Sequence, residues 1–109
     1  MPQKNPATQV FEQFDALAQQ WSAHCRSVAL SSNMNDYLNT GAYRELVNLG
    51  TPAIPYIMER YRINDLPWGF LLDDITGLHM IEDRNHFSPS EVKKRWLDWW
   101  DAQKRARRK

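Results

Sequence analysis

Apolar residues recur at helical spacing in the first quarter of the chain. Between Ala7 and about Val28 they follow one another at steps of three, four or seven, at Val10, Phe14, Leu17, Trp21 and Val28. Polar residues take the other side, at Gln13, Gln19, Gln20, Ser22 and Arg26. An apolar stripe with this period faces a protein core when the segment is helical. The pattern therefore predicts a long amphipathic helix over this stretch.

A second and a third helix are predicted in the middle of the chain. A polar connector (31–36) and a break (39–41) precede a short helix with Tyr43, Leu46 and Val47 facing inward. Gly50 lies where a residue with positive φ commonly ends a helix. Thr51 can cap the next helix, with Pro52 at its first position and Pro55 still in its first turn. Its inward residues are Ile54, Ile57, Met58 and Tyr61.

The last third of the chain predicts two more helices. Residues 64–67 end the preceding helix, and a helix from about Trp68 to Gly77 is apolar on more than one side, which predicts a central position. Residues 78–88 are expected to be irregular. Ser88 or Ser90 can cap the last helix, whose apolar face carries Val92, Trp96, Trp99 and Trp100.

These segments together predict an all-α protein, a compact bundle of about five helices. Period-two alternation, which would indicate strands, is absent over any useful length. We expect residues 1–6 to be disordered, residues 7–102 to form a single helical domain, and residues 103–109 to form a basic tail. A chain of 109 residues fits one domain of this kind.

Part of the chain resembles a known helical repeat. The run LVNLGTPAIPYIMERYR (46–62) is similar to a HEAT-type helical hairpin, and PWGFLLDDITG (67–77) would begin the next unit. Such units bury their apolar faces against their neighbours, and an array needs about three repeats for stability. Because only one hairpin is clear, we expect the long first helix and the Trp-rich last helix to close the core.

A longer stretch, from about Phe14 to Trp100, resembles a family of small uncharacterised bacterial proteins. The shared positions are Trp21, Ser31, Ser32, Tyr43, Gly50, Pro55, Trp68, Leu72, Ile75, Thr76, Gly77, Trp96 and Trp99. The resemblance implies a HEAT-like helical fold and an association with mobile or phage-like gene neighbourhoods. It supplies no catalytic residue. The chain departs from the family pattern after Gly77, where it reads LHMIEDRNHF.

Cysteine content and hydropathy bear on location. Cys25 is the only cysteine, so no intramolecular disulfide can form, which favours a reducing cytoplasm. The first residues lack the apolar core of a signal peptide, and no apolar run approaches the roughly 20 residues of a membrane span. We therefore expect a cytoplasmic protein with no membrane partner.

The net charge of +1 conceals an uneven distribution. Residues 1–92 carry −5, whereas residues 93–109 carry eight basic and two acidic side chains, or +6. A basic helix end can contact nucleic-acid phosphates. The candidate phosphate contacts are Lys93, Lys94, Lys104, Arg105, Arg107, Arg108 and Lys109. The alternative is that these cations suit a helix C-terminus and keep the end of the chain soluble.

Two groups of residues could carry chemistry, and we expect neither to do so. Asp73, Asp74, His79 and His86 are potential metal ligands, but the carboxylates diverge by about 100° on a helix. We interpret them as a solvated acidic face with loop histidines. Cys25 beside His24 diverges in the same way, and we interpret it as a half-buried structural thiol. We expect no catalytic residue, no metal and no cofactor.

The tryptophans of the last helix are the candidate protein interface. Trp96 and one neighbour fit a buried face, whereas the adjacent Trp99 and Trp100 cannot both point directly inward. One of these two is expected to be partly exposed, where it suits a protein partner. The sequence thus favours a non-enzymatic protein-interaction or adaptor module, with a further copy of the chain among the partners considered. A nucleic-acid-binding accessory of a mobile-element or phage-like system is the alternative.

Overall fold

The chain folds as helices joined by short connections. The computed structural model describes residues 6–31, 34–83 and 86–107, and within them it contains six α-helices, one 3-10 helix and no strand. The elements are α1 (Pro6–Ser27), α2 (Met34–Leu38), α3 (Gly41–Leu49), η1 (Thr51–Ala53), α4 (Ile54–Ile63), α5 (Trp68–Thr76) and α6 (Pro89–Arg107). The all-α class predicted from the spacing is confirmed. The helix beyond the five predicted is α2, which lies largely within the expected polar connector.

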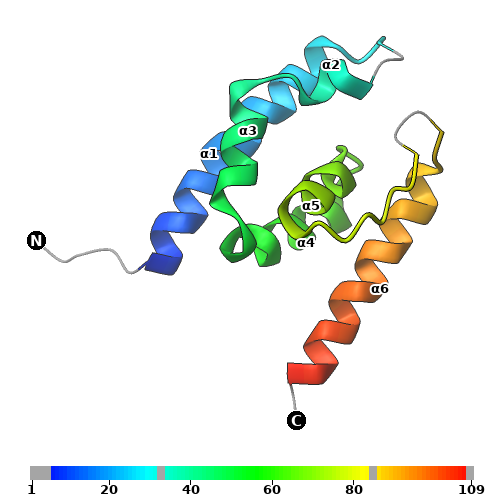
Figure 1. The fold of residues 1–109 in the computed structure, drawn as a ribbon. Helices are drawn as coiled ribbons and strands as arrows, with labels where there is room; N and C mark the ends of the chain where they lie inside the picture. The colour runs from blue at the N-terminus through cyan, green and yellow to red at the C-terminus, as the bar shows by residue number, and fades with distance from the viewer. Residues whose placement is uncertain (1–5, 32–33, 84–85, 108–109) are drawn as a thin grey trace, which may run out of the picture.

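The helices pack around α5. Figure 1 shows α1 and α3 side by side at one flank, α4 and α5 in the middle, and α6 at the other flank. α3 contacts α1 and α5, whereas α4 contacts α5 and α6. Every residue of α5 from Trp68 to Asp73 is buried, so its predicted central position is confirmed. The two helices of the predicted HEAT-like hairpin thus pack largely on other elements, and that likeness stays a prediction.

Two glycines end helices as the sequence predicts. Gly50 has φ 71° and its N–H donates to the Val47 carbonyl at 3.0 Å, at the end of α3. Gly77 has φ 72° and its N–H donates to the Asp73 carbonyl at 2.8 Å, at the end of α5. Both residues lie in the half of backbone space that side chains disfavour, which is why glycine suits them.

The start of α4 differs from the prediction. Thr51 does not cap this helix, because residues 51–53 form a tighter 3-10 turn in which the Ala53 N–H donates to the Gly50 carbonyl at 3.1 Å. α4 then begins at Ile54, and Pro55 still falls in its first turn, where no N–H is needed. Of the two serines considered for α6, Ser88 is the cap, since its Oγ accepts from the Glu91 N–H at 3.4 Å.

Aromatic rings form the centre of the core. The Trp21 and Trp68 rings meet edge to face with centroids 5.1 Å apart, and Tyr43 and Phe14 each contact one of them. Trp21 also donates from Nε1 to the Tyr37 carbonyl at 2.8 Å, which fastens α2 to α1. Large rings at helical spacing on α1 therefore do meet α3 and α5, as an amphipathic helix requires.

Three further predictions concern extent and environment. Residues 1–5, 108 and 109 lie outside the described residues, so the predicted disorder of 1–6 concerns mainly that part; Pro6 already belongs to α1. Residues 103–107, assigned to a basic tail, continue α6. In the described part of the chain, no helix combines the length and apolar character needed to cross a membrane.

Candidate functional site

The two adjacent tryptophans of α6 take different environments. Trp96 is fully buried, and Trp100, one turn further along the same face, is only 8% exposed. Trp99 is half-buried and packs edge to face on Trp96, with ring centroids 5.4 Å apart. Trp99 is therefore the partly exposed member of the pair, a point that the sequence left open.

Trp99 and Trp100 line a hollow between α6, the start of α4 and the end of α5. The hollow has a volume of about 580 Å³. Its apolar lining consists of Pro52, Ile54, Pro55, Ile75, Leu78, Trp99 and Trp100. We call it the Trp99 groove. Pro52, Pro55 and Leu78 are exposed, the last at 49%, so the groove presents apolar surface to solvent.

Three residues of the Trp99 groove escaped the sequence analysis. The sequence predicts helix-start positions for Pro52 and Pro55 and an irregular stretch around Leu78, with no role in an interface. Leu78 could be recognised from the sequence as an apolar residue with no helical face to bury it, because it directly follows the helix-ending Gly77. Its position beside Trp99 depends on packing between segments far apart in the sequence.

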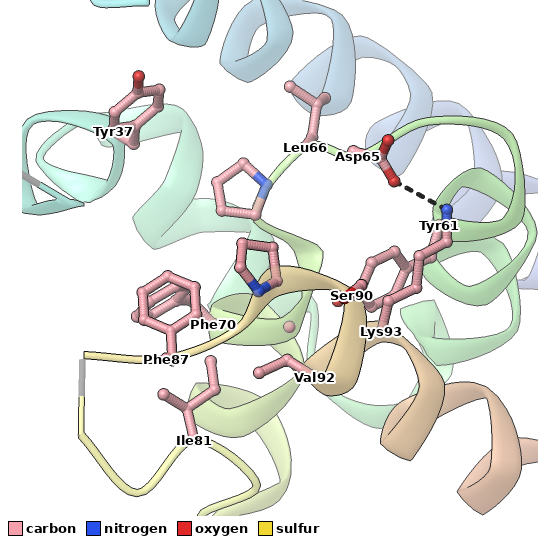
Figure 2. A pocket seen from close by; sticks show the side chains of 13 residues that line it. Tyr37, Tyr61, Asp65, Leu66, Phe70, Ile81, Phe87, Ser90, Val92 and Lys93 are labelled. Atoms are coloured by element: carbon pink, nitrogen blue, oxygen red, sulfur yellow. Dashed lines mark hydrogen bonds and ion pairs between the residues drawn. The ribbon is translucent and has the colours of Figure 1, made fainter. Parts of the chain in front are cut away.

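A second hollow lies at the opposite end of α6. It has a volume of about 490 Å³ and is enclosed by the start of α6, the end of α4, the start of α5 and residues near Ile81 and Phe87. Figure 2 shows its largely apolar walls, with Asp65 and Lys93 among the side chains drawn. We call it the Tyr61 cavity, after the buried tyrosine that lines it.

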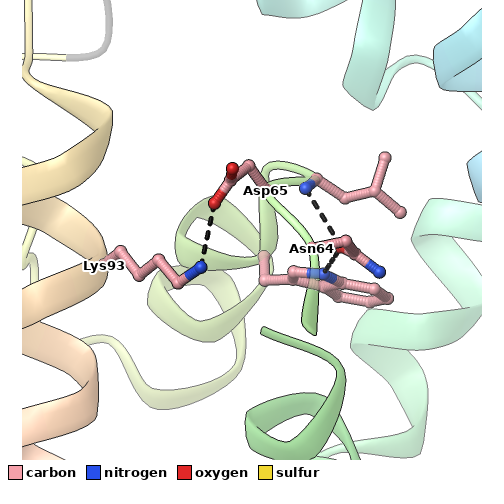
Figure 3. Close-up of polar contacts among 5 residues, drawn as sticks. Asn64, Asp65 and Lys93 are labelled. Carbon is pink, nitrogen blue, oxygen red and sulfur yellow. Dashed lines mark hydrogen bonds and ion pairs between the residues drawn. The ribbon is translucent and has the colours of Figure 1, made fainter. Parts of the chain in front are cut away.

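The two candidate phosphate contacts nearest the start of α6 are paired with carboxylates. Lys93 donates to Asp65 at 2.9 Å, as Figure 3 shows, and Lys94 donates to Asp98 at 2.7 Å. Hydrogen bonding to Asp98 and its negative charge raise the pKa of Lys94. These pairs reduce the field that Lys93 and Lys94 can offer to a polyanion.

The other basic residues lie at the far end of α6, beside the Trp99 groove. Residues 101–106 are all exposed, and this part of α6 extends away from the other helices in Figure 1. The Lys104 ammonium lies over the Trp100 ring, 5.6 Å from its centroid, and Arg105 is exposed. Arg107 ends the helix, and Arg108 and Lys109 lie outside the described residues. The structure thus places Lys104 next to one of the interface tryptophans.

Asp73 corrects the expectation of a solvated acidic face. It is only 7% exposed, and its two carboxylate oxygens accept from the Met80 N–H at 2.7 Å and the Ile81 N–H at 2.9 Å. The neighbouring Asp74 is exposed and accepts from the Tyr43 hydroxyl. Among the described residues, no three His, Cys, Asp or Glu side chains gather as metal ligands. The sequence could not anticipate Asp73 because its partners are loop N–H groups.

Cys25 is buried rather than half-buried. Its side chain lies on the face of α1 that is buried in the protein core, and this burial raises the pKa of the thiol to about 11. The His24 ring does not serve it, since Nε2 pairs with the Asp36 carbonyl at 2.6 Å. A thiol of this kind is a structural residue rather than a nucleophile.

Comparison with models of known protein families, with curated proteins and with solved structures yields no match to this chain. The resemblance to a family of small bacterial proteins therefore stays a prediction from the sequence. The class that the fold defines is a small all-α protein.

Proposed function

We propose that the protein is a non-enzymatic interaction module that binds an acidic, apolar-anchored segment of another protein in the Trp99 groove. The observation that carries the proposal is the juxtaposition of exposed apolar side chains with the basic end of α6. Trp99, Leu78 and the two prolines supply the apolar surface. Lys104, whose ammonium lies over the Trp100 ring, supplies the adjacent charge, and Arg105 follows it on the exposed end of α6.

The apolar part of the groove favours a protein partner. A half-buried tryptophan that lines a hollow together with proline and leucine is an apolar, aromatic surface of the kind found in interface cores. Burying Leu78, which is 49% exposed, would contribute about 1 kcal/mol or more. The prolines add apolar area with little side-chain entropy to lose.

The charged part determines which protein segment fits. In the part of the chain that the structure describes, no ion pair is found for Lys104 or Arg105. Asp101, one turn earlier, already pairs with Arg62 at 2.8 Å. A partner carrying Asp or Glu next to an aromatic or leucine anchor would therefore complement both halves of the site.

A peptide selection tests this proposal. The full chain would be used to select from a displayed library of random 12-residue peptides, and we expect enrichment of sequences that combine Asp or Glu with Trp, Phe or Leu. Leu78→Ser should weaken the selected peptides at least about 10-fold because an apolar contact is lost. Ile63→Ser is the matched control, since Ile63 is exposed and does not line the groove.

Charge reversal tests the basic half separately. Lys104→Glu with Arg105→Glu should weaken the same peptides and reduce the salt dependence of binding. Arg26→Glu with Arg44→Glu changes the net charge equally at exposed positions on α1 and α3, and should leave binding unchanged. Enrichment of uncharged or basic peptides, or equal effects of the two double variants, would contradict the proposal.

A gel shift with a 20-base-pair duplex distinguishes the nucleic-acid alternative. If the duplex binds with a steep loss between about 50 and 200 mM salt, and Lys104→Glu with Arg105→Glu abolishes that binding, phosphate contact by α6 replaces the peptide proposal.

The cytoplasmic location is also part of the proposal, because a single buried cysteine suits a reducing compartment.

A further inference from the structure

We propose that the Tyr61 cavity is a binding site for a small aromatic carboxylate. The site is separate from the Trp99 groove and does not depend on the function proposed for that groove. Its volume of about 490 Å³ lies within the range of small-molecule sites, about 300–1,000 Å³. Its walls come from α4, α5, α6 and the segment before α6, so it exists only in the folded protein.

The walls suit an aromatic ring. Phe70 and Phe87 meet edge to face with centroids 5.1 Å apart, and Ile81, Val92 and two prolines complete the apolar lining. Figure 2 shows Phe70, Phe87 and Ile81 grouped on one side of the cavity, with Tyr61 and Lys93 on the other. A planar ring could insert between these sides and bury most of its surface against apolar atoms.

Tyr61 supplies the polar observation that points to a ligand. Its side chain is only 4% exposed, and no hydrogen bond to its hydroxyl is found within the described residues. The hydroxyl is nevertheless not a sealed-off polar atom, since among the described residues only Trp96 Nε1 is both fully buried and without a partner. The hydroxyl lies beside Gly69, where an added Cβ would be 3.1 Å from it, and both residues line the cavity. The hydroxyl therefore lies where it is open to the cavity, and an acceptor atom of a bound molecule fits this position.

Lys93 determines the charge of the head group. Its ammonium lies over the Tyr61 ring, 5.7 Å from the centroid, and its side chain is 25% exposed. Its carboxylate partner Asp65 is 86% exposed and can turn into water while Lys93 stays in place. Once Asp65 turns away, the polar groups left at the mouth include the Lys93 ammonium and the Tyr61 hydroxyl, two donors that together suit a carboxylate.

A titration with three related probes tests the site. ¹H–¹⁵N spectra of the full chain would be recorded with indole-3-acetate, its neutral analogue indole-3-acetamide, and the cation tryptamine. We expect indole-3-acetate to shift the amides that line the cavity and to bind about 10-fold more tightly than the amide, because only the acid forms charge-assisted hydrogen bonds. Equal affinities for the three probes, or no shift at about 10 mM, would overturn the proposal.

Variants identify the groups responsible. Lys93→Met should reduce the affinity for indole-3-acetate to that of the amide, whereas Lys94→Met, an adjacent paired lysine outside the cavity, should change nothing. Tyr61→Phe should lower the affinity for indole-3-acetate several-fold. Asp65→Asn should raise that affinity about 3-fold, because Lys93 then loses a competing partner.

These variants keep the proposal falsifiable even if one of them folds poorly. Asp65 is almost fully exposed, so Asp65→Asn tests the head group without disturbing the core. An unchanged or weakened affinity of that variant for indole-3-acetate would contradict the assigned role of Lys93. Shifts confined to residues around Trp99 would likewise overturn the assignment, since they would place the acid in the groove.

Discussion

Individual buried residues of this protein have environments that lead to specific chemical behaviour. Cys25 and Asp73 are the clearest cases, since both look reactive in the sequence and both lie in the core. Burial removes the thiol from solvent, whereas the carboxylate accepts hydrogen bonds from two backbone N–H groups. Each consequence can be measured with one substitution or one reagent.

Cys25 should react slowly with thiol reagents. A pKa raised to about 11 from an ordinary value of 9.0 leaves about 100-fold less thiolate at pH 8. We expect the reaction of the native protein with Ellman's reagent to be at least that much slower than the reaction in 6 M guanidinium chloride. A native rate close to the denatured rate would show that the thiol is accessible.

The same thiol should make stability depend on alkaline pH. Its folded pKa lies above its unfolded value, so above about pH 9 the unfolded chain releases the proton first, and stability is lost progressively towards pH 11. Below pH 9 the contribution is constant. Urea unfolding measured at pH 8 and pH 10.5 should show a smaller decrease for Cys25→Ala than for the natural chain.

Asp73 should be needed for the segment that follows α5. Asp73→Ala leaves the Met80 and Ile81 N–H groups without acceptors, and unsatisfied groups of this kind cost about 1–3 kcal/mol each. Asp73→Asn retains one carbonyl acceptor and should cost less. Glu82→Ala is the control at an exposed acidic position, and equal destabilisation by the two alanine variants in urea unfolding would contradict this role.

At the scale of elements, the contact between α5 and α6 depends on the absence of a side chain. An added Cβ at Gly69 would lie 2.7 Å from Val92 Cγ1 and 3.4 Å from Trp96 Cδ1. Both neighbours are buried on α6, so neither can move without displacing the helix. Gly69 thus lets the two helices approach, although its conformation would suit other residues.

Gly69→Ala should therefore destabilise the protein by about 1–3 kcal/mol, the usual cost of overpacking a core. Gly41→Ala is the control, because no atom lies within 4 Å of its added Cβ, and alanine is favoured over glycine in a helix. Thermal unfolding should show a lower melting temperature for Gly69→Ala and a higher one for Gly41→Ala. A second change, Val92→Ala, should recover part of the loss in Gly69→Ala, and full additivity would show that the clash is absent.

The positions of most helices can be predicted from local sequence, but which helices pack against one another cannot. The spacing of Phe14 and Trp21 predicts α1. Gly50 and Gly77 mark helix ends because the backbone there has a positive φ, which glycine adopts most readily. α2 escapes prediction because it has only five residues, too few to show a helical period, and it is attached through a hydrogen bond from Trp21. Which of Trp99 and Trp100 faces inward depends on the rotation of α6 against α4 and α5.

The candidate sites were predicted only in part for the same reason. Trp99, Trp100 and the basic end of α6 are adjacent in sequence and could be recognised together. Leu78 and the prolines of the groove join them only through packing, and the Tyr61 cavity is lined by residues from Tyr37 to Lys93. No local pattern records that Tyr61 lines this cavity.

At the scale of the whole molecule, Trp68 joins α5 to α1 and to the turn between α4 and α5. Its ring contacts Trp21 and Phe14 of α1, and its Nε1 donates to Asn64 Oδ1 at 2.7 Å (Figure 3). The same oxygen accepts from the Leu66 N–H at 3.2 Å, which orders the turn between α4 and α5. Loss of this residue should therefore affect the entire domain.

Trp68→Ala should lower the free energy of unfolding by about 3–5 kcal/mol, the usual cost of removing a large buried ring. The total free energy of unfolding of a small domain is about 5–15 kcal/mol, so a loss of this size removes a large part of it. Much of the variant should therefore be unfolded at 37 °C. Circular dichroism during urea unfolding would measure the change. Leu30→Ala, at a fully exposed position, is the control, and similar midpoints for both would contradict the assigned burial.

The inaccessible Cys25 also makes the molecule convenient to handle. Because the only native thiol is shielded, a cysteine introduced at the exposed Ala23 would be the single site for maleimide coupling. Ala23 lies on α1, across the molecule from α6 (Figure 1), so a sensor surface attached there would leave the Trp99 groove open. The residue that looked most like a nucleophile thus provides a silent background for oriented immobilisation.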